Sequence, residues 1–332
     1  MPNPSPSAVE DIRKLAYNTL LEEELLSILR ALAEEKIDAL VLKGLPLLDR
    51  LGTRIETRRI ADNDILVHAS DAPRAASILA KLGYHAPRLR SLEMDLKSDF
   101  QHPLFRTPPR GAPFVVELHW NAFPLYLGVP ESILWENRQT WRLRDTEISV
   151  LNKELCLLHL ASHYLQHLGL ELRILEEFAR AHEAWREELN LPRLIQLINS
   201  TRTHDIFPYC LQLAKDRGLL KSEPVVPLTE RARSMLRWLP GPPEQEAHHG
   251  DAYRRSLLVW WFVARNSLLK LIFISTFPSI RKMEHRYQET RRSRLFLLYL
   301  CRPLRPLWRL ASRLAKKRAA WRSARLTPGP LR

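Results

Sequence analysis

The pattern of apolar residues divides this chain near residue 151. Before that point, short apolar runs of strand length alternate with helical stretches, and after it apolar residues recur at helical spacing almost to the end. This order predicts an α+β domain followed by a helical domain. The expected boundaries are an N-terminal helix in residues 1–36, a sheet-bearing domain in 37–151, a helical domain in 152–280 and a basic amphipathic tail in 281–332.

The expected strands are apolar runs rich in β-branched and aromatic residues: 38–43, 60–68, 98–107, 114–120 and 141–151. The expected helices show apolar positions at helical spacing: 9–36, 44–51, 72–82, 152–169, 172–188, 191–200, 205–219, 228–238, 251–275 and 290–320. Asp71 is the expected N-cap of helix 72–82, Gly83 its stop, and residues 240–246 an exposed Pro-rich loop.

The net charge of +14 is concentrated at the C-terminal end. Residues 281–332 contain 16 Lys or Arg and only two acids, so the preceding 280 residues are electrically balanced. A balanced body argues against a nucleic-acid-binding core, and the basic tail has an anionic surface as its expected partner. The three cysteines have no paired spacing, which favours a reduced, cytoplasmic setting over a disulfide framework.

Two acids open the second expected strand, in the run Asp62-Asn63-Asp64. Alternate side chains of a strand share a face, so Asp62 and Asp64 should point the same way. A cation between them would remove their repulsion, and Mg²⁺ suits oxygen ligands of this kind. Such a pair also arises by chance, so its meaning depends on what surrounds it.

Glu117 is a lone acid in the apolar strand 114–120, where it would share a face with His119. Burying an unpaired carboxylate is costly, which suggests a charged partner. The alternative is an edge strand whose glutamate faces solvent.

The order of these elements resembles the polymerase β-like nucleotidyltransferase superfamily and, more closely, the uncharacterised nucleotidyltransferase family of bacteria. The similar segments are Leu42-Lys43-Gly44, Arg58, Asp62–Val67, Gly83-Tyr84, His102 and Val116–Trp120, then His159, His163, Arg173 and Glu177, and finally Phe277-Pro278, Arg286-Tyr287 and Tyr299–Arg302. Two positions depart from the pattern. Asn63 replaces an apolar residue, which suggests a less buried strand back, and Leu45 replaces a serine or glycine after Gly44.

The resemblance implies a mixed sheet with flanking helices and a helical C-terminal domain. It also implies transfer of a nucleoside monophosphate from a nucleoside triphosphate to an unknown acceptor, a small molecule, saccharide or peptide. Asp62, Asp64 and Glu117 would then be the catalytic residues and would hold Mg²⁺ or Mn²⁺. Lys43, Gly44 and Arg58 would bind the nucleotide, with Lys43 otherwise an ordinary strand-end lysine and Arg58 preferred to Arg59 by alignment alone.

Three histidines, His159, His163 and His167, follow one stripe of the helix after the sheet. For these three histidines, structural roles are favoured over a zinc site. A different set, His102, His119 and His163, are the candidates for contacting the substrate or supporting the site.

The tail mixes aromatic and aliphatic residues with many basic ones, as membrane-surface helices do. The expected location is therefore cytoplasmic, with the tail either at the inner face of the membrane or simply solvated. The alternative function is a non-catalytic nucleotide-binding or membrane-docking protein that keeps the fold.

Overall fold

A computed structural model describes residues 6–88, 90–109 and 111–239, together with the single residues 259, 294, 296 and 297. All of its named helices and strands belong to the compact unit formed by residues 1–265. Apart from these four single residues, the helices expected at 251–275 and 290–320, the loop 240–246 and the tail 281–332 lie outside this description. None of the described helices is long and apolar enough to cross a membrane.

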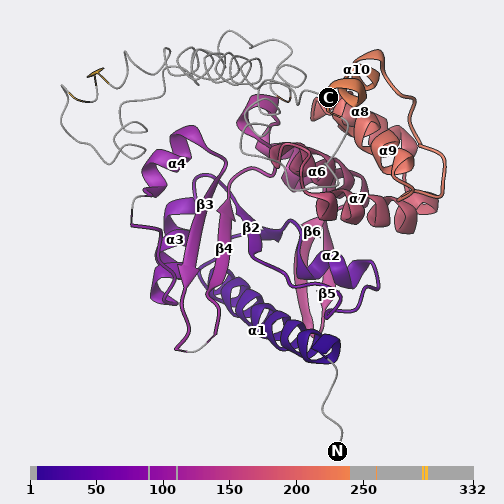
Figure 1. Ribbon diagram of the computed structural model, residues 1–332. Coiled ribbons are helices and arrows are strands. Elements are labelled where there is room, and N and C mark those ends of the chain that lie inside the picture. The colour runs from indigo at the N-terminus through magenta and orange to yellow at the C-terminus, as the bar shows by residue number, and fades with distance from the viewer. Residues whose placement is uncertain are drawn as a thin grey trace, which may run out of the picture. The chain divides into compact units, whose positions relative to one another are not determined.

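A six-stranded mixed sheet forms the centre of the described part, in the order β3-β4-β2-β1-β6-β5 (Figure 1). Its strands are β1 (Ala39–Val41), β2 (Asn63–Val67), β3 (Gln101–Arg106), β4 (Phe114–His119), β5 (Arg138–Leu143) and β6 (Thr146–Leu151). β2 runs parallel to β4 and β1 runs parallel to β6, while the other neighbours are antiparallel.

Ten helices and two 3₁₀ turns accompany the sheet in the described residues. The helices are α1 (Pro6–Glu34), α2 (Leu45–Arg50), α3 (Ala72–Lys81), α4 (Leu92–Ser98), α5 (Glu131–Glu136), α6 (Lys153–Gln166), α7 (Leu172–Trp185), α8 (Leu191–Ser200), α9 (Ile206–Asp216) and α10 (Glu230–Trp238), and the turns are η1 (Leu125–Leu127) and η2 (Arg186–Glu188). This mixed sheet with flanking helices is the α+β architecture expected from the sequence.

The two faces of the sheet are covered by different helices. On one face, strand residues such as Ile65 and Val116 pack with α1 and α3. On the other face, Leu40 and Leu66 share a core with α6, α7 and the helices that follow. Figure 1 shows α8, α9 and α10 grouped with α6 and α7. Alternation along each strand therefore decides which side chains face α6 and α7. The division of the chain at residue 151 stays a prediction.

Two local expectations were wrong, those for residues 141–151 and for Asn63, and one was met in position only. Residues 141–151 are not one strand, because the β5–β6 hairpin turns at Arg144-Asp145, where Arg144 has a φ of +51°. Asp71 is the N-cap residue of α3, as expected, but its side chain makes no cap hydrogen bond and contacts Arg74 instead, at 3.3 Å. The face of β2 that carries Asn63 is not poorly buried. Asn63 is 2% exposed, and its Nδ2 donates to the Leu21 carbonyl at 3.0 Å.

Asn18, inside α1, holds the loop that leads into β2. Its Nδ2 donates to the carbonyls of Ile55 and Arg58, at 2.6 and 2.7 Å, and its Oδ1 accepts from the Ile60 N–H at 2.9 Å. The side chain is completely buried. One residue thus satisfies three backbone groups of a segment that has no regular hydrogen bonding of its own.

We expect Asn18→Ala to lower the free energy of unfolding by at least about 2 kcal/mol, because a buried backbone group left without a partner costs about 1–3 kcal/mol. Urea unfolding followed by circular dichroism measures this. Asn199→Ala, at an exposed position of α8, is the control and should leave the midpoint unchanged. Equal midpoints for the two variants would contradict the assigned role of Asn18.

Candidate active site

The acidic residues meet where β2 and β4 lie side by side. Asp64 and Glu117 are direct partners in the parallel register of these strands, so their side chains share the face toward α6 and α7. Asp62 precedes β2 by one residue and is two positions from Asp64. Because β4 lies between β3 and β2, the alternative of an edge-strand glutamate is excluded.

Lys43 closes the gap between the two aspartates. It follows β1, and its Nζ lies 2.6 Å from Asp64 Oδ2 and 3.5 Å from Asp62 Oδ1. Only 12% of this side chain is exposed, and none of Asp64. The position of the ammonium group between two carboxylates disfavours the reading of Lys43 as an ordinary strand-end lysine.

His119 contacts two acids of the same cluster from a buried position. Its Nε2 lies 3.2 Å from Asp64 Oδ1 and 3.6 Å from Glu117 Oε2. The ring is 3% exposed, and the register of β4 with β2 turns it to the same face as Glu117. Asp64, Glu117 and His119 each offer one ligand atom, all within 4.8 Å of one another.

The charges in this cluster stabilise one another. Burial acts to lower the pKa of Lys43, but Asp64, Asp62 and Glu117 together raise it above its usual range. Burial acts to raise the pKa of Asp64, yet Lys43 and His119 hold it well below the ordinary value. Burial likewise opposes the charged form of His119, but hydrogen bonds to Asp64 and Glu117 raise its pKa to about 9. Burial and the neighbouring Asp64 raise the pKa of Asp62.

A pocket of about 250 Å³ opens onto the exposed edge of this cluster. Its walls come from the end of β1, the loop before β2, the start of β3 and the corner between α6 and α7. The lining residues are Lys43, Gly44, Arg58, Ile60, Ala61, Asp62, Phe100, Gln101, Glu117, His163, Gln166, His167, Arg173, Ile174 and Glu177. Asp64 and His119 lie beneath this surface.

The nucleotide-binding candidates reach the pocket. Gly44 has a φ of +78°, a conformation that a side chain would strain, so glycine is required there. Arg58 lines the pocket and is ion-paired with Glu177 of α7. Arg59 instead lies over the ring of Tyr17, 4.2 Å from its centroid. The geometry therefore favours Arg58 over Arg59 as the residue that faces a ligand.

The structure separates the candidate histidines. His163 lines the pocket, and burial together with nearby Lys43 holds its pKa well below the ordinary value. His159 is buried, and its Nδ1 donates to the Ala122 carbonyl at 2.8 Å, which is a structural role. His102 does not lie on the face of the sheet that carries the carboxylates, contrary to the supporting role expected for it. It pairs with Leu118, whose side chain faces away from the carboxylates, and lies 2.7 Å from Asp95.

Sequence reasoning missed several residues of the site. Phe100, Gln101 and Gln166 line the pocket without belonging to any recognisable motif. Asn18 also escaped notice, although it holds the loop that carries Arg58. The sequence contained a signal for it, because Asn18 is a polar residue in the apolar stripe that continues with Leu21 and Leu25.

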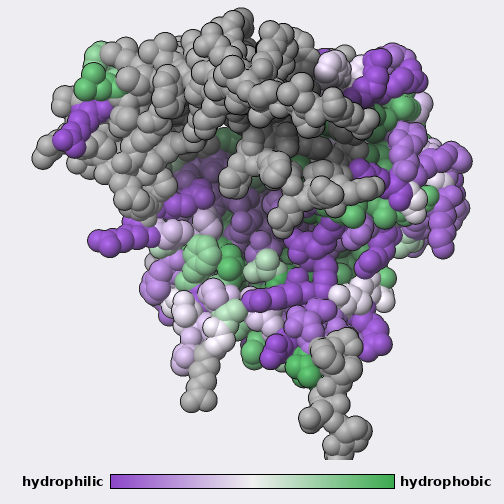
Figure 2. All heavy atoms as spheres, in the orientation of Figure 1, coloured by the Kyte–Doolittle hydropathy of each residue, from purple (hydrophilic) through white to green (hydrophobic). Residues whose placement is uncertain are grey.

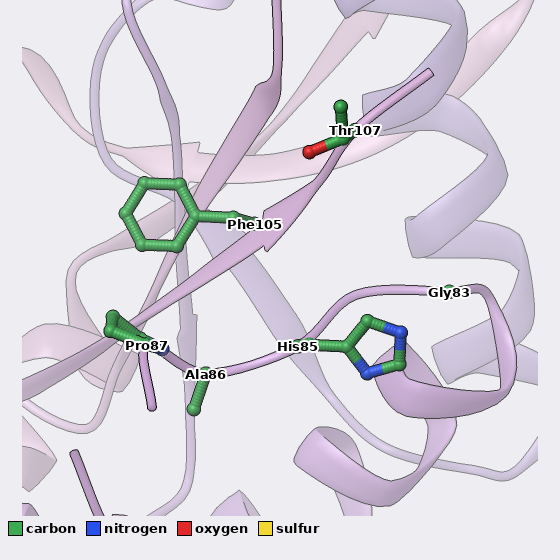
Figure 3. Close-up of a pocket in the computed structure, with 6 residues that line it drawn as sticks. All are labelled: Gly83, His85, Ala86, Pro87, Phe105 and Thr107. Atoms are coloured by element: carbon green, nitrogen blue, oxygen red, sulfur yellow. The ribbon is translucent and has the colours of Figure 1, made fainter. Parts of the chain in front are cut away.

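A second, larger hollow lies beside β3, where His85 and Phe105 form a β-bridge, and its lining has different chemistry. Figure 3 shows the residues that line it: Gly83, His85, Ala86, Pro87, Phe105 and Thr107. The volume of this hollow is about 470 Å³. The lining residues include no carboxylate and one ionisable side chain, His85. On the face drawn in Figure 2, hydrophobic side chains of the described residues form small patches separated by hydrophilic ones, as on ordinary protein surfaces. The charged pocket is therefore the better candidate for a site of catalysis.

The mixed sheet, with an aspartate pair at the start of one strand and a glutamate on the parallel neighbour, defines a protein of the nucleotidyltransferase fold. The family described as uncharacterised nucleotidyltransferase matches residues 11–217, and the chain belongs to this family. No curated protein matches the chain. The match confirms the family inferred from sequence and supports a general nucleotidyl transfer function. It includes every element that contributes to the pocket.

Proposed function

We propose that this protein is a metal-dependent nucleotidyltransferase that moves a nucleoside monophosphate from a nucleoside triphosphate to an acceptor of small-molecule, saccharide or peptide nature. One observation carries the proposal: Asp62, Asp64 and Glu117 converge beside an open pocket whose wall also contains Lys43 and Gly44. A non-catalytic protein that keeps the fold has no need for three carboxylates gathered beside a ligand pocket, one of them fully buried.

The donor set fits a divalent cation. Carboxylate oxygens are the ligands that Mg²⁺ and Mn²⁺ take, and Asp64 is a fully buried carboxylate held ionised by neighbouring cations. Asp62, Asp64 and Glu117 would hold the metal, which supplies charge neutralisation for the triphosphate and a lower pKa for an acceptor hydroxyl.

The other pocket residues orient the nucleotide. Lys43 carries its positive charge at the pocket floor, where it would offset negative charge on the departing pyrophosphate. Arg58 and Arg173 add two more cations on the wall formed with α7. Glu177 holds the Arg58 guanidinium before a nucleotide arrives, and Gly44 lets the backbone approach the phosphates closely.

The experiment that tests the proposal compares two radioactive labels. The protein is incubated with Mg²⁺ or Mn²⁺, a cell extract as acceptor source, and each nucleoside triphosphate labelled at either the α or the γ phosphate. Nucleotidyl transfer places the α label on an acceptor and releases the γ label as pyrophosphate. Glu117→Gln is the matched variant, because it keeps the size of a partly exposed side chain and removes its charge.

We expect α label on an acceptor with the wild type and none with Glu117→Gln. Transfer of the γ label instead would mean phosphoryl transfer and would refute the proposed reaction. Nucleotide binding without transfer of either label, with every base, would favour the non-catalytic alternative. Membrane docking by residues 281–332 stays a separate prediction, since those residues lie outside the described part of the chain.

A further inference from the structure

A histidine lies beside two of the three acids that are proposed to hold the metal. Among the described residues, Asp64, Glu117 and His119 are the three whose ligand atoms lie within 4.8 Å of one another. They come from β2 and β4, which are adjacent and parallel, so the sheet itself fixes their spacing. Asp62 precedes β2 and shares Lys43 with Asp64.

The separations within this group match those of ligands around one cation. Two atoms each about 2.1 Å from an ion lie about 3.0 Å apart at a right angle and about 3.4 Å apart at a tetrahedral angle. His119 Nε2 is 3.2 Å from Asp64 Oδ1 and 3.6 Å from Glu117 Oε2. An ion can therefore replace these direct contacts with small side-chain movements.

The direction and burial of His119 support the same reading. Its ring is nearly inaccessible to solvent, and Nε2 is the nitrogen turned toward both carboxylates. Glu117 also lines the pocket, so an ion held by all three residues would have its open side toward a bound substrate. Two other candidate histidines are placed differently: His159 Nδ1 donates to a backbone carbonyl, and His102 lies on the opposite face of the sheet.

We propose that His119 Nε2 is a direct metal ligand beside Asp64 and Glu117, so that the site prefers a divalent transition-metal ion such as Mn²⁺ to Mg²⁺. Imidazole nitrogen suits transition ions, whereas Mg²⁺ takes oxygen ligands. The ion takes the place of the proton that Nε2 shares with the two carboxylates, because a ligating histidine must be neutral. The inference rests on the proposed function for its relevance to catalysis, but its test requires neither acceptor nor turnover.

The test is pulsed electron paramagnetic resonance of the full-length protein with Mn²⁺. A histidine nitrogen bound to Mn²⁺ adds ¹⁴N frequencies to the electron spin echo, and a water or carboxylate oxygen ligand contributes no ¹⁴N frequencies. We expect ¹⁴N modulation in the wild type, replaced by the ¹⁵N pattern when only histidine is ¹⁵N-labelled. His119→Gln should remove it, whereas His102→Gln and His163→Gln should retain it. The labelled wild type gives an answer even if His119→Gln fails to fold.

Competition titrations give the second readout. We expect wild-type protein to bind Mn²⁺ at least about tenfold more tightly than Mg²⁺, and His119→Gln to reduce this ratio severalfold. Absence of nitrogen modulation in Mn²⁺-loaded wild type, its loss in His163→Gln but not in His119→Gln, or no Mn²⁺ binding would overturn the proposal. A nitrogen-ligated Mn²⁺ without label transfer would leave it standing and refute only the proposed reaction.

Discussion

Asp64→Asn should lower the rate of nucleotidyl transfer by at least about 10³-fold. Asp64 is the only fully buried carboxylate of the described cluster and contacts both Lys43 and His119. Asparagine keeps its size and one oxygen but lacks the negative charge that holds a divalent ion. A bound metal contributes several kcal/mol to transition-state stabilisation, and about 1.4 kcal/mol corresponds to tenfold in rate. Label transfer under saturating nucleotide measures the effect.

The control is Asp38→Asn. Asp38 is an exposed aspartate just before β1, and its partner is Arg138, at 3.5 Å. Its replacement should change the rate by no more than about twofold, as for surface substitutions in general. Circular dichroism of both variants checks that the sheet remains folded. A folded Asp64→Asn protein that keeps more than about a tenth of the wild-type rate would show that Asp64 is not essential to the site.

Much of this site could be predicted from the sequence, because the alternation of side chains along a strand depends only on neighbouring residues. The period of a strand places Asp62 and Asp64 on one face, and likewise Glu117 and His119, before any partner is known. The structure agrees on both pairs. What sequence could not supply is the pairing of β2 with β4, which sets Asp64 opposite Glu117 and depends on the whole sheet. Because of that pairing, His119, which already shares a face with Glu117, also lies next to Asp64.

The errors have the same origin. His102 lies in the predicted strand, but its face is decided by the register with β4, which no local pattern contains. The β5–β6 hairpin escaped prediction because Arg144-Asp145 carries no glycine or asparagine, although Arg144 adopts a positive φ. Asn63 is buried against α1 because its side chain finds the Leu21 carbonyl, a contact between segments about 40 positions apart.

The second large effect is expected on stability. Lys43→Met should lower the free energy of unfolding in the absence of divalent ions by about 3–5 kcal/mol, the usual cost of removing one partner of a buried ion pair. Lys43 contacts Asp64 and Asp62, and without it His119 is the only described cation in contact with Asp64. The carboxylates then repel one another at close range. Urea unfolding in chelator-treated buffer measures the loss.

Added Mn²⁺ should reverse part of this loss, because a divalent ion near Asp62 and Asp64 replaces the missing ammonium charge. Ligand binding to the folded state stabilises it by RT ln(1 + [L]/Kd), and removal of the competing Lys43 lowers Kd. The gain from Mn²⁺ should therefore be larger in Lys43→Met than in the wild type. Lys153→Met, which removes an exposed partner of Glu188, should show neither the loss nor the added gain. If Lys43→Met were as stable as the wild type without metal and responded no more strongly to Mn²⁺, Lys43 would not be the cation that balances these acids.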